Sequence, residues 1–187
     1  IAMGYLTMDA LTTGACNVAI GQNALGVSTT GCFNVAIGVQ TLGLTDTTGN
    51  CNIAIGIAAM DALTTGCNNV GIGNAALGAS TTGCRNIAIG ELAMSASDTG
   101  RRNIAIGQSA MAVATGDGDD NVAIGTCALG CCAMSSHSNV ALGTQAMSAL
   151  RGAEDNVAIG RCAFGVATTG CCNIAIGRGA LGGTATT

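Results

Sequence analysis

Residues 17–21 read Asn-Val-Ala-Ile-Gly, and this short stretch decides how the rest of the chain is interpreted. The pattern recurs along the whole 187-residue sequence in steps of 17 or 18 residues, with Gly replacing Ala in one copy. Residues 1–4 form an eleventh, truncated copy. A fixed period of this kind is the signature of a repeat architecture. The Asn positions are Asn17, Asn34, Asn52, Asn69, Asn86, Asn103, Asn121, Asn139, Asn156 and Asn173.

Each copy continues with a second apolar pair and a polar turn, as in Ala24-Leu25 and Thr29-Thr30-Gly31. The period is too short for the two helices of a common helical repeat. Neither apolar stretch buries itself alone, but stacking on neighbouring copies buries both. The sequence therefore predicts an all-β fold, a β-solenoid of about eleven coils of 17–18 residues, whose strands pair about 4.8 Å apart. We interpret residues 1–187 as one solenoid segment of a longer chain.

Side chains alternate across a strand, so Val18 and Ile20 share one face and Ala19 lies on the other. We assign the Val/Ile columns to the interior, together with the Leu/Met column of a second strand. The remaining column never exceeds Ala in size, which suggests a surface that another backbone approaches closely. A long exposed apolar strip predicts self-association. The predicted self-association face is Ala19, Ala36, Ala54, Gly71, Ala88, Ala105, Ala123, Ala141, Ala158 and Ala175.

The Asn column is unbroken in all ten complete copies. Stacked amides satisfy one another and nearby turn backbone groups along a repeat axis. We therefore predict that these ten residues form a structural ladder. A glycan is not expected on them, because glycosylation needs Ser or Thr at the third position, where this motif has Ala or Gly.

Asn-Val-Ala-Ile-Gly followed by Ala-Leu and a small polar turn resembles the head repeats of YadA-type trimeric autotransporter adhesins. It is similar also to the longer repeats of bacteriophage tail-fibre proteins. The resemblance covers essentially the whole chain, although the coil here is larger than in YadA heads and is rich in cysteine. It implies a left-handed β-roll, a parallel homotrimer about a common axis, and a role in adhesion or host attachment.

Eleven Cys residues are the least usual feature of the composition, and seven of them lie one or two positions before an Asn of the repeat. Cys67 and Cys84 occupy the same position on neighbouring coils, about 4.8 Å apart, a separation that a disulfide accepts. Cys16 with Cys32 is a diagonal alternative, with Cys51 competing for Cys32. The candidate disulfide residues are Cys67, Cys84, Cys16, Cys32, Cys51, Cys171 and Cys172.

Other states of the cysteines stay open at this point. The total is odd, so at least one thiol is free or bonded to another chain. Free buried thiols are one alternative, and a metal is another. The metal alternative rests on one coil that holds the single His, with loose spacing that matches no established zinc signature. Its residues are Cys127, Cys131, Cys132 and His137.

Charge and composition argue against several function classes. The net charge is −4 and the six Arg are scattered, so a nucleic-acid groove is not expected. No apolar run approaches the roughly 18 residues that span a bilayer, so membrane insertion is not expected. No triad or paired carboxylates recur, so we expect no enzyme activity, no cofactor and no metal. Oppositely charged residues such as Arg101 and Asp119 stack at one corner, as weak exposed ion pairs or as a docking strip.

The preferred hypothesis is a trimeric attachment or structural fibre segment, reinforced by disulfides, at a virion or other extracellular surface. Its expected partners are copies of itself, with a cell-surface receptor or other fibre proteins. A polymerising filament or coat subunit is the alternative, since stacked repeats join end to end. An ice-binding solenoid is a further alternative, suggested by the Thr pairs, such as Thr12-Thr13 and Thr64-Thr65.

Overall fold

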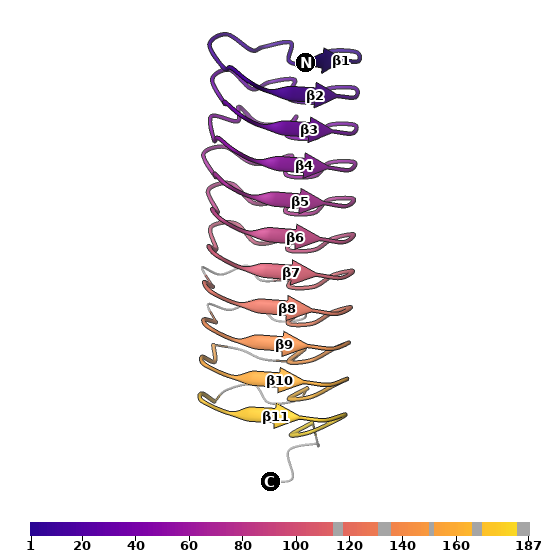
Figure 1. Cartoon of the computed structure of the whole chain (residues 1–187), viewed down its shortest axis with the longest axis vertical. Coiled ribbons are helices and arrows are strands. Elements are labelled where there is room, and N and C mark those ends of the chain that lie inside the picture. Colours follow the sequence, from indigo (N-terminus) through magenta and orange to yellow (C-terminus); the bar gives the residue numbers. More distant parts are fainter. Residues whose placement is uncertain (114–117, 131–135, 150–151, 166–169, 183–187) are drawn as a thin grey trace.

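The computed structural model describes residues 1–113, 118–130, 136–149, 152–165 and 170–182. Eleven short strands form a single parallel sheet whose spatial order is the sequence order. Figure 1 shows them as one stack of arrows with the same direction, and β1 and β11 at opposite ends. The described residues contain no helix, and the predicted β-solenoid is confirmed. The strands are β1 (Ala2–Met3), β2 (Val18–Ile20), β3 (Val35–Ile37), β4 (Ile53–Ile55), β5 (Val70–Ile72), β6 (Ile87–Ile89), β7 (Ile104–Ile106), β8 (Val122–Ile124), β9 (Val140–Leu142), β10 (Val157–Ile159) and β11 (Ile174–Ile176).

The register follows the repeat without slippage. Ala19 pairs with Ala36 and Ala36 pairs with Ala54, although the second step is one residue longer than the first. The extra residue of an 18-residue copy is therefore absorbed outside the strand. Because every strand pairs with its own equivalent, each position of the motif becomes a column along the axis.

The structure reverses the predicted faces of the strand. The Ala column lies inside the coil, and the Val and Ile columns point outward. Nothing of Ala36 or Ala88 is exposed in a single chain, so these residues are not a self-association face. The residues corrected in this way are Ala19, Ala36, Ala54, Gly71, Ala88, Ala105, Ala123, Ala141, Ala158 and Ala175.

The physical reason is the thinness of the interior. The large side chains opposite the strand, such as Leu42 and Met60, are fully buried and leave room only for methyl groups. At Gly71, an added Cβ would already lie 2.9 Å from Cε of Met60. The restriction of this column to Ala and Gly thus reports crowding inside the coil, since a packed interior has little free volume.

The second predicted strand is also replaced. The Ala-Leu or Ala-Met segment forms a turn, in which two residues per coil have left-handed backbone angles, as at Ala58 (φ 52°) and Met60 (φ 52°). The turn still bonds to both neighbouring coils. Ala58 N–H donates to Val39 O on the preceding coil at 3.0 Å, and Met60 N–H donates to Ala76 O on the following coil at 3.0 Å.

The glycine after each strand is fixed by the stacking itself. Gly73 has φ +133°, and a Cβ there would lie 2.5 Å from the carbonyl oxygen of Gly90 on the next coil. That backbone angle is open to glycine and strained for other residues. Each coil therefore sits as close to its neighbour as two bare backbones allow.

The buried Ala column gives a direct test of the reversed faces. Ala88→Leu inserts a larger side chain into the closed interior, and we expect it to lower the free energy of unfolding by about 1–3 kcal/mol. Ala79→Leu makes the same change at an exposed turn and should cost no more than about 0.5 kcal/mol. Denaturant unfolding followed by circular dichroism compares the two variants. Equal stability of the two would contradict the buried position of Ala88.

Candidate interaction surface

The ten Asn of the repeat lie just before the strands, and all but the partly exposed Asn173 are buried, although their side chains are polar. The pattern is shown by Asn34, whose Nδ2 donates to Gly49 O at 2.9 Å. Its Oδ1 accepts the backbone N–H of Asn52 at 2.9 Å on the next coil. Each amide from Asn17 to Asn156 thus closes its own coil and holds the following one, and Asn173 bonds back to Asn156. We call the set of ten the Asn ladder. Its members are Asn17, Asn34, Asn52, Asn69, Asn86, Asn103, Asn121, Asn139, Asn156 and Asn173.

The chemistry of the site selects Asn over its nearest relatives. Asn86 both donates, through Nδ2 to Gly100 O at 2.7 Å, and accepts, through Oδ1 from Asn103 N–H at 3.0 Å. A carboxylate only accepts, so Asp would set two oxygens against each other in a buried site. Among the described residues, every buried side-chain nitrogen or oxygen has a partner. The ladder is therefore a fully satisfied polar network beside an apolar core.

We expect Asn86→Asp to lower the free energy of unfolding at neutral pH by about 3 kcal/mol, because a buried charge replaces a donor. Burial beside a carbonyl raises the pKa of the new carboxyl above its unfolded value. The loss should therefore shrink as the pH falls, when the protonated carboxyl regains a donor. Asn74→Asp, at an exposed position, is the control and should change stability little. A loss at Asn86 that is independent of pH would argue against this bonding.

The outward side chains of the strands form one long apolar surface, which we call the apolar face. Neighbouring coils cover each side chain along the axis but leave its outer part open. Ile20 and Ile89 each expose 36% of their surface and Ile124 exposes 40%. The face consists of Val18, Ile20, Val35, Ile37, Ile53, Ile55, Val70, Ile72, Ile87, Ile89, Ile104, Ile106, Val122, Ile124, Val140, Leu142, Val157, Ile159, Ile174 and Ile176.

The size of the apolar face sets it apart from ordinary exposed residues. It runs the length of the sheet and exposes on the order of 1,000 Å², whereas monomers rarely expose more than a few hundred. Exposed Tyr5, Val39 and Ile57, which follow the strand glycines, widen it over the first coils. Val and Ile suit strands in any case, but a fully solvated strand face would tolerate Thr or charged residues in the same columns.

The residue two positions before each Asn forms the corner column, which lies beside the apolar face. Five of its side chains accept a hydrogen bond from the backbone of the preceding coil. Asn50 Oδ1 accepts Cys32 N–H at 2.7 Å, and Asp119 Oδ1 accepts Arg101 N–H at 2.7 Å. Sulfur makes the same bond at Cys32 and Cys84, and Cys84 Sγ accepts Cys67 N–H at 3.2 Å. Its members from the second coil on are Cys32, Asn50, Cys67, Cys84, Arg101, Asp119, His137, Glu154 and Cys171.

This capping role was missed by sequence reasoning, which considered the cysteines only as bridges, free thiols or metal ligands. The available signal was the set of residue types that share the corner column with Cys. Asn, Asp and His share it, and all three accept hydrogen bonds. At His137, Nδ1 accepts Asp119 N–H at 3.1 Å, as the neutral imidazole does.

The structure separates most of the predicted disulfide candidates and brings one pair from neighbouring coils together, while the adjacent Cys171 and Cys172 also interact through their side chains. Cys67 and Cys84 have their Sγ atoms 3.1 Å apart. Cys16 and Cys51 lie in the column nearest the Asn, where the residue between them is Phe33. All of the described cysteines are thiols, and Cys16, Cys51, Cys171 and Cys172 are exposed.

Two of the four residues behind the metal alternative, Cys131 and Cys132, lie outside the described residues. Within the described part of the chain, no three His, Cys, Asp or Glu side chains gather as a metal site would require. Cys162, in the same column as Cys127, has its Sγ 3.5 Å from Oε1 of Gln145 on the coil between them. The structure therefore gives no support to a metal centre in the residues it describes.

The charged corner differs in detail from the stacking expected for it. Arg102, rather than Arg101, pairs through its guanidinium, with Nε 2.6 Å from Oδ1 of Asp120 and Nη2 3.2 Å from Oδ2 of Asp119. The hydrogen bond from Arg102 lowers the pKa of the Asp120 carboxyl below its usual value. Both partners are exposed, so this pair is a surface feature with little effect on stability.

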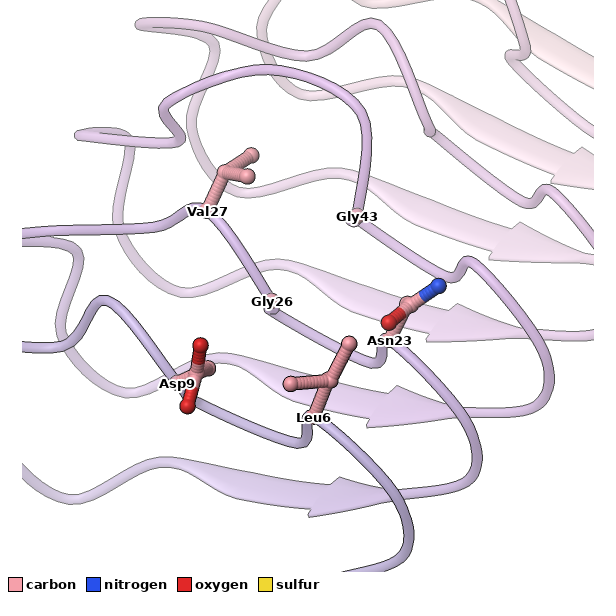
Figure 2. Close-up of a pocket in the computed structure, with 6 residues that line it drawn as sticks. All are labelled: Leu6, Asp9, Asn23, Gly26, Val27 and Gly43. Carbon is pink, nitrogen blue, oxygen red and sulfur yellow. The ribbon is translucent and has the colours of Figure 1, made fainter.

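The hollows on the surface are shallow. Figure 2 shows one on the first coils, where Gly26 and Gly43 leave a gap beside Leu6, Asp9, Asn23 and Val27. Its ionisable group is the single carboxylate of Asp9, with the amide of Asn23 nearby. The Thr pairs of the turns are used within the solenoid: Thr12 Oγ1 donates to Thr29 O at 3.0 Å, and Thr64 Oγ1 donates to Thr81 O at 2.9 Å.

Comparison of the chain with protein-family models, with curated proteins and with solved structures found no match. In the residues that the structure describes, no helix has the length and apolar character needed to cross a bilayer. The largest feature available for recognition is thus the apolar face, with the corner column along its edge.

Proposed function

We propose that this chain is a non-catalytic rod segment that assembles with copies of itself through the apolar face. The supporting observation is the outward display of Val and Ile on successive coils of one straight sheet. Burial of this face contributes roughly 25 cal/mol per Å² of apolar area. A standard stable interface buries about 800 Å² on each partner, so the face is large enough for one.

A second copy of the chain is the partner that fits this face best. The columns repeat once per coil, and a parallel copy has the same repeat, so one favourable contact is reproduced along the whole rod. A globular partner has no reason to match this spacing. We propose the parallel homotrimer, which is supported by the resemblance of the Asn-Val-Ala-Ile-Gly repeat to YadA-type heads and phage tail-fibre repeats.

The resemblance also supports a role as a structural or attachment fibre at a virion or other extracellular surface. The eleven Cys fit an oxidising location of this kind, where disulfides persist. The receptor would then contact the surfaces that remain exposed in the trimer, including the corner column. This proposal needs a rigid, repetitive scaffold and no catalytic group.

The assembly is tested with two Lys substitutions on alternate coils of the apolar face, Ile72→Lys and Ile106→Lys, in one variant. We expect the unaltered chain to sediment as a trimer and this variant as a folded monomer, because buried unpaired charges oppose association. Sedimentation equilibrium gives the mass, and circular dichroism checks the fold. Val113→Lys with Ala79→Lys places the same charges on exposed turns and should leave the trimer intact.

The decisive outcomes are distinct. A monomeric unaltered chain under native conditions would refute the self-association. A face variant that remains oligomeric while folded would show that another surface carries the assembly. A stable dimer or tetramer would be compatible with self-association through the apolar face but would refute the proposed trimer.

A further inference from the structure

Cys67 and Cys84 are stacked on consecutive coils of the corner column, with their Sγ atoms 3.1 Å apart. The column follows the sheet register here, since Cys84 forms a parallel bridge with Arg101. In-register neighbours have Cα atoms about 4.8 Å apart, inside the range of roughly 4.4–6.8 Å that disulfides span. The two coils are therefore already at a suitable separation, and a disulfide could form by a movement of the two sulfurs alone.

No other described cysteines share a column on consecutive coils. Cys32 makes the same hydrogen bonds as Cys84, accepting Ala15 N–H at 3.3 Å and donating to Thr30 O at 3.4 Å. The next coil offers Cys32 the amide of Asn50 instead of a thiol. Cys32 thus has the same local environment as Cys84 without a sulfur partner, which makes it an internal reference.

We propose that Cys67 and Cys84 form a reversible dithiol–disulfide site that joins two neighbouring coils covalently under oxidising conditions. The site lies within one chain, so it goes beyond the proposed assembly and does not depend on it. It assigns one of the pairings that the cysteine count leaves open.

The reaction needs an oxidant, for which a low-molecular-weight disulfide such as oxidised glutathione serves. One protein thiol loses its proton to solvent, attacks a glutathione sulfur, and releases one glutathione thiolate. The second protein thiol, also deprotonated, then attacks the mixed disulfide, which forms the Sγ–Sγ bond and releases the second glutathione. Two protein thiols are oxidised and one glutathione disulfide is reduced.

The Cys84 sulfur makes hydrogen bonds to the backbone in the reduced form, which favours a switchable bond over a permanent one. Cys84 Sγ accepts Cys67 N–H and is 3.5 Å from Thr82 O, the carbonyl to which it donates. The hydrogen bond that the Cys67 thiol shares with Cys84 Sγ, together with partial burial, raises the pKa of the Cys67 thiol. Attack by Cys67 is therefore slow at neutral pH and accelerates as the pH rises.

Differential alkylation across glutathione redox buffers tests the site on the full chain. Cleavage before Asp yields fragment 61–97, in which Cys67 and Cys84 are the only cysteines, and fragment 9–45, which holds Cys16 and Cys32. We expect fragment 61–97 from the oxidised protein to be lighter by two hydrogens and to resist alkylation. Fragment 9–45 should take two alkyl groups in the same sample, unless Cys16 is bonded to another chain.

Cys84→Asn is the matched control, because Asn50 already caps this column at the equivalent position. It should fold normally and lose the fragment mass change. Oxidation should raise the midpoint of thermal unfolding of the unaltered chain by about 5 °C, and this shift should be absent in the variant. Should Cys84→Asn fold poorly, Cys67→Ser removes the same bond.

Two results would overturn the proposal. The first is fragment 61–97 carrying two alkyl groups at a glutathione potential that oxidises other thiols of the chain. The second is a bond from Cys67 or Cys84 to a cysteine of another fragment. A monomeric chain that nevertheless forms the Cys67–Cys84 bond would refute the assembly and leave this site standing.

Discussion

The buried amide of each repeat is the interaction on which the rest of the solenoid depends. In Asn69, Nδ2 donates to Gly83 O at 2.8 Å across the coil, while Oδ1 accepts the N–H of Asn86 at 2.9 Å on the next one. A single side chain therefore sets both the circumference of a coil and its height above the neighbour. The strands are only three residues long in most coils. Without these two hydrogen bonds of the Asn amide, few interactions would hold the strand ends in place.

The small circumference has consequences for the two sides of the sheet. The interior accommodates one methyl group from the strand opposite one Leu or Met from the turn, so the larger β-branched residues must lie outside. Val and Ile are among the residues that proteins most often bury completely. The reversal here leaves a continuous apolar surface along the outside of the sheet, because each coil is too thin to enclose the larger side chains.

Much of the fold could be predicted from the sequence, because a period of 17 or 18 residues with an unbroken Asn specifies stacked coils and their register. The inner face of the strand could not. Alternation separates Val18 and Ile20 from Ala19 but does not say which side is inside. The absence of any residue larger than Ala reports close approach, and a thin core and an interface both produce it.

Two further features, the left-handed turn and the capping by sulfur, could not be predicted with simple sequence rules. The turn at Met60 needs a left-handed backbone at a residue other than glycine, which propensity argues against, so the segment was interpreted as a strand. The capping by Cys32 and Cys84 depends on sulfur acting as an acceptor, a weak role that is visible only when the corner column is compared coil by coil. The Asn ladder, in contrast, followed from a polar residue that no complete copy replaces.

The most direct test of this account is the exchange of Asn side-chain amide protons with solvent, measured by nuclear magnetic resonance. Asn86 donates its amide inside the ladder, whereas Asn74 is exposed on a turn of the same chain. If the hydrogen bonds of the Asn ladder hold the coils together, the side-chain amide protons of Asn86 should exchange at least about a hundredfold more slowly than those of Asn74. Equal exchange rates at the two residues would contradict the central claim.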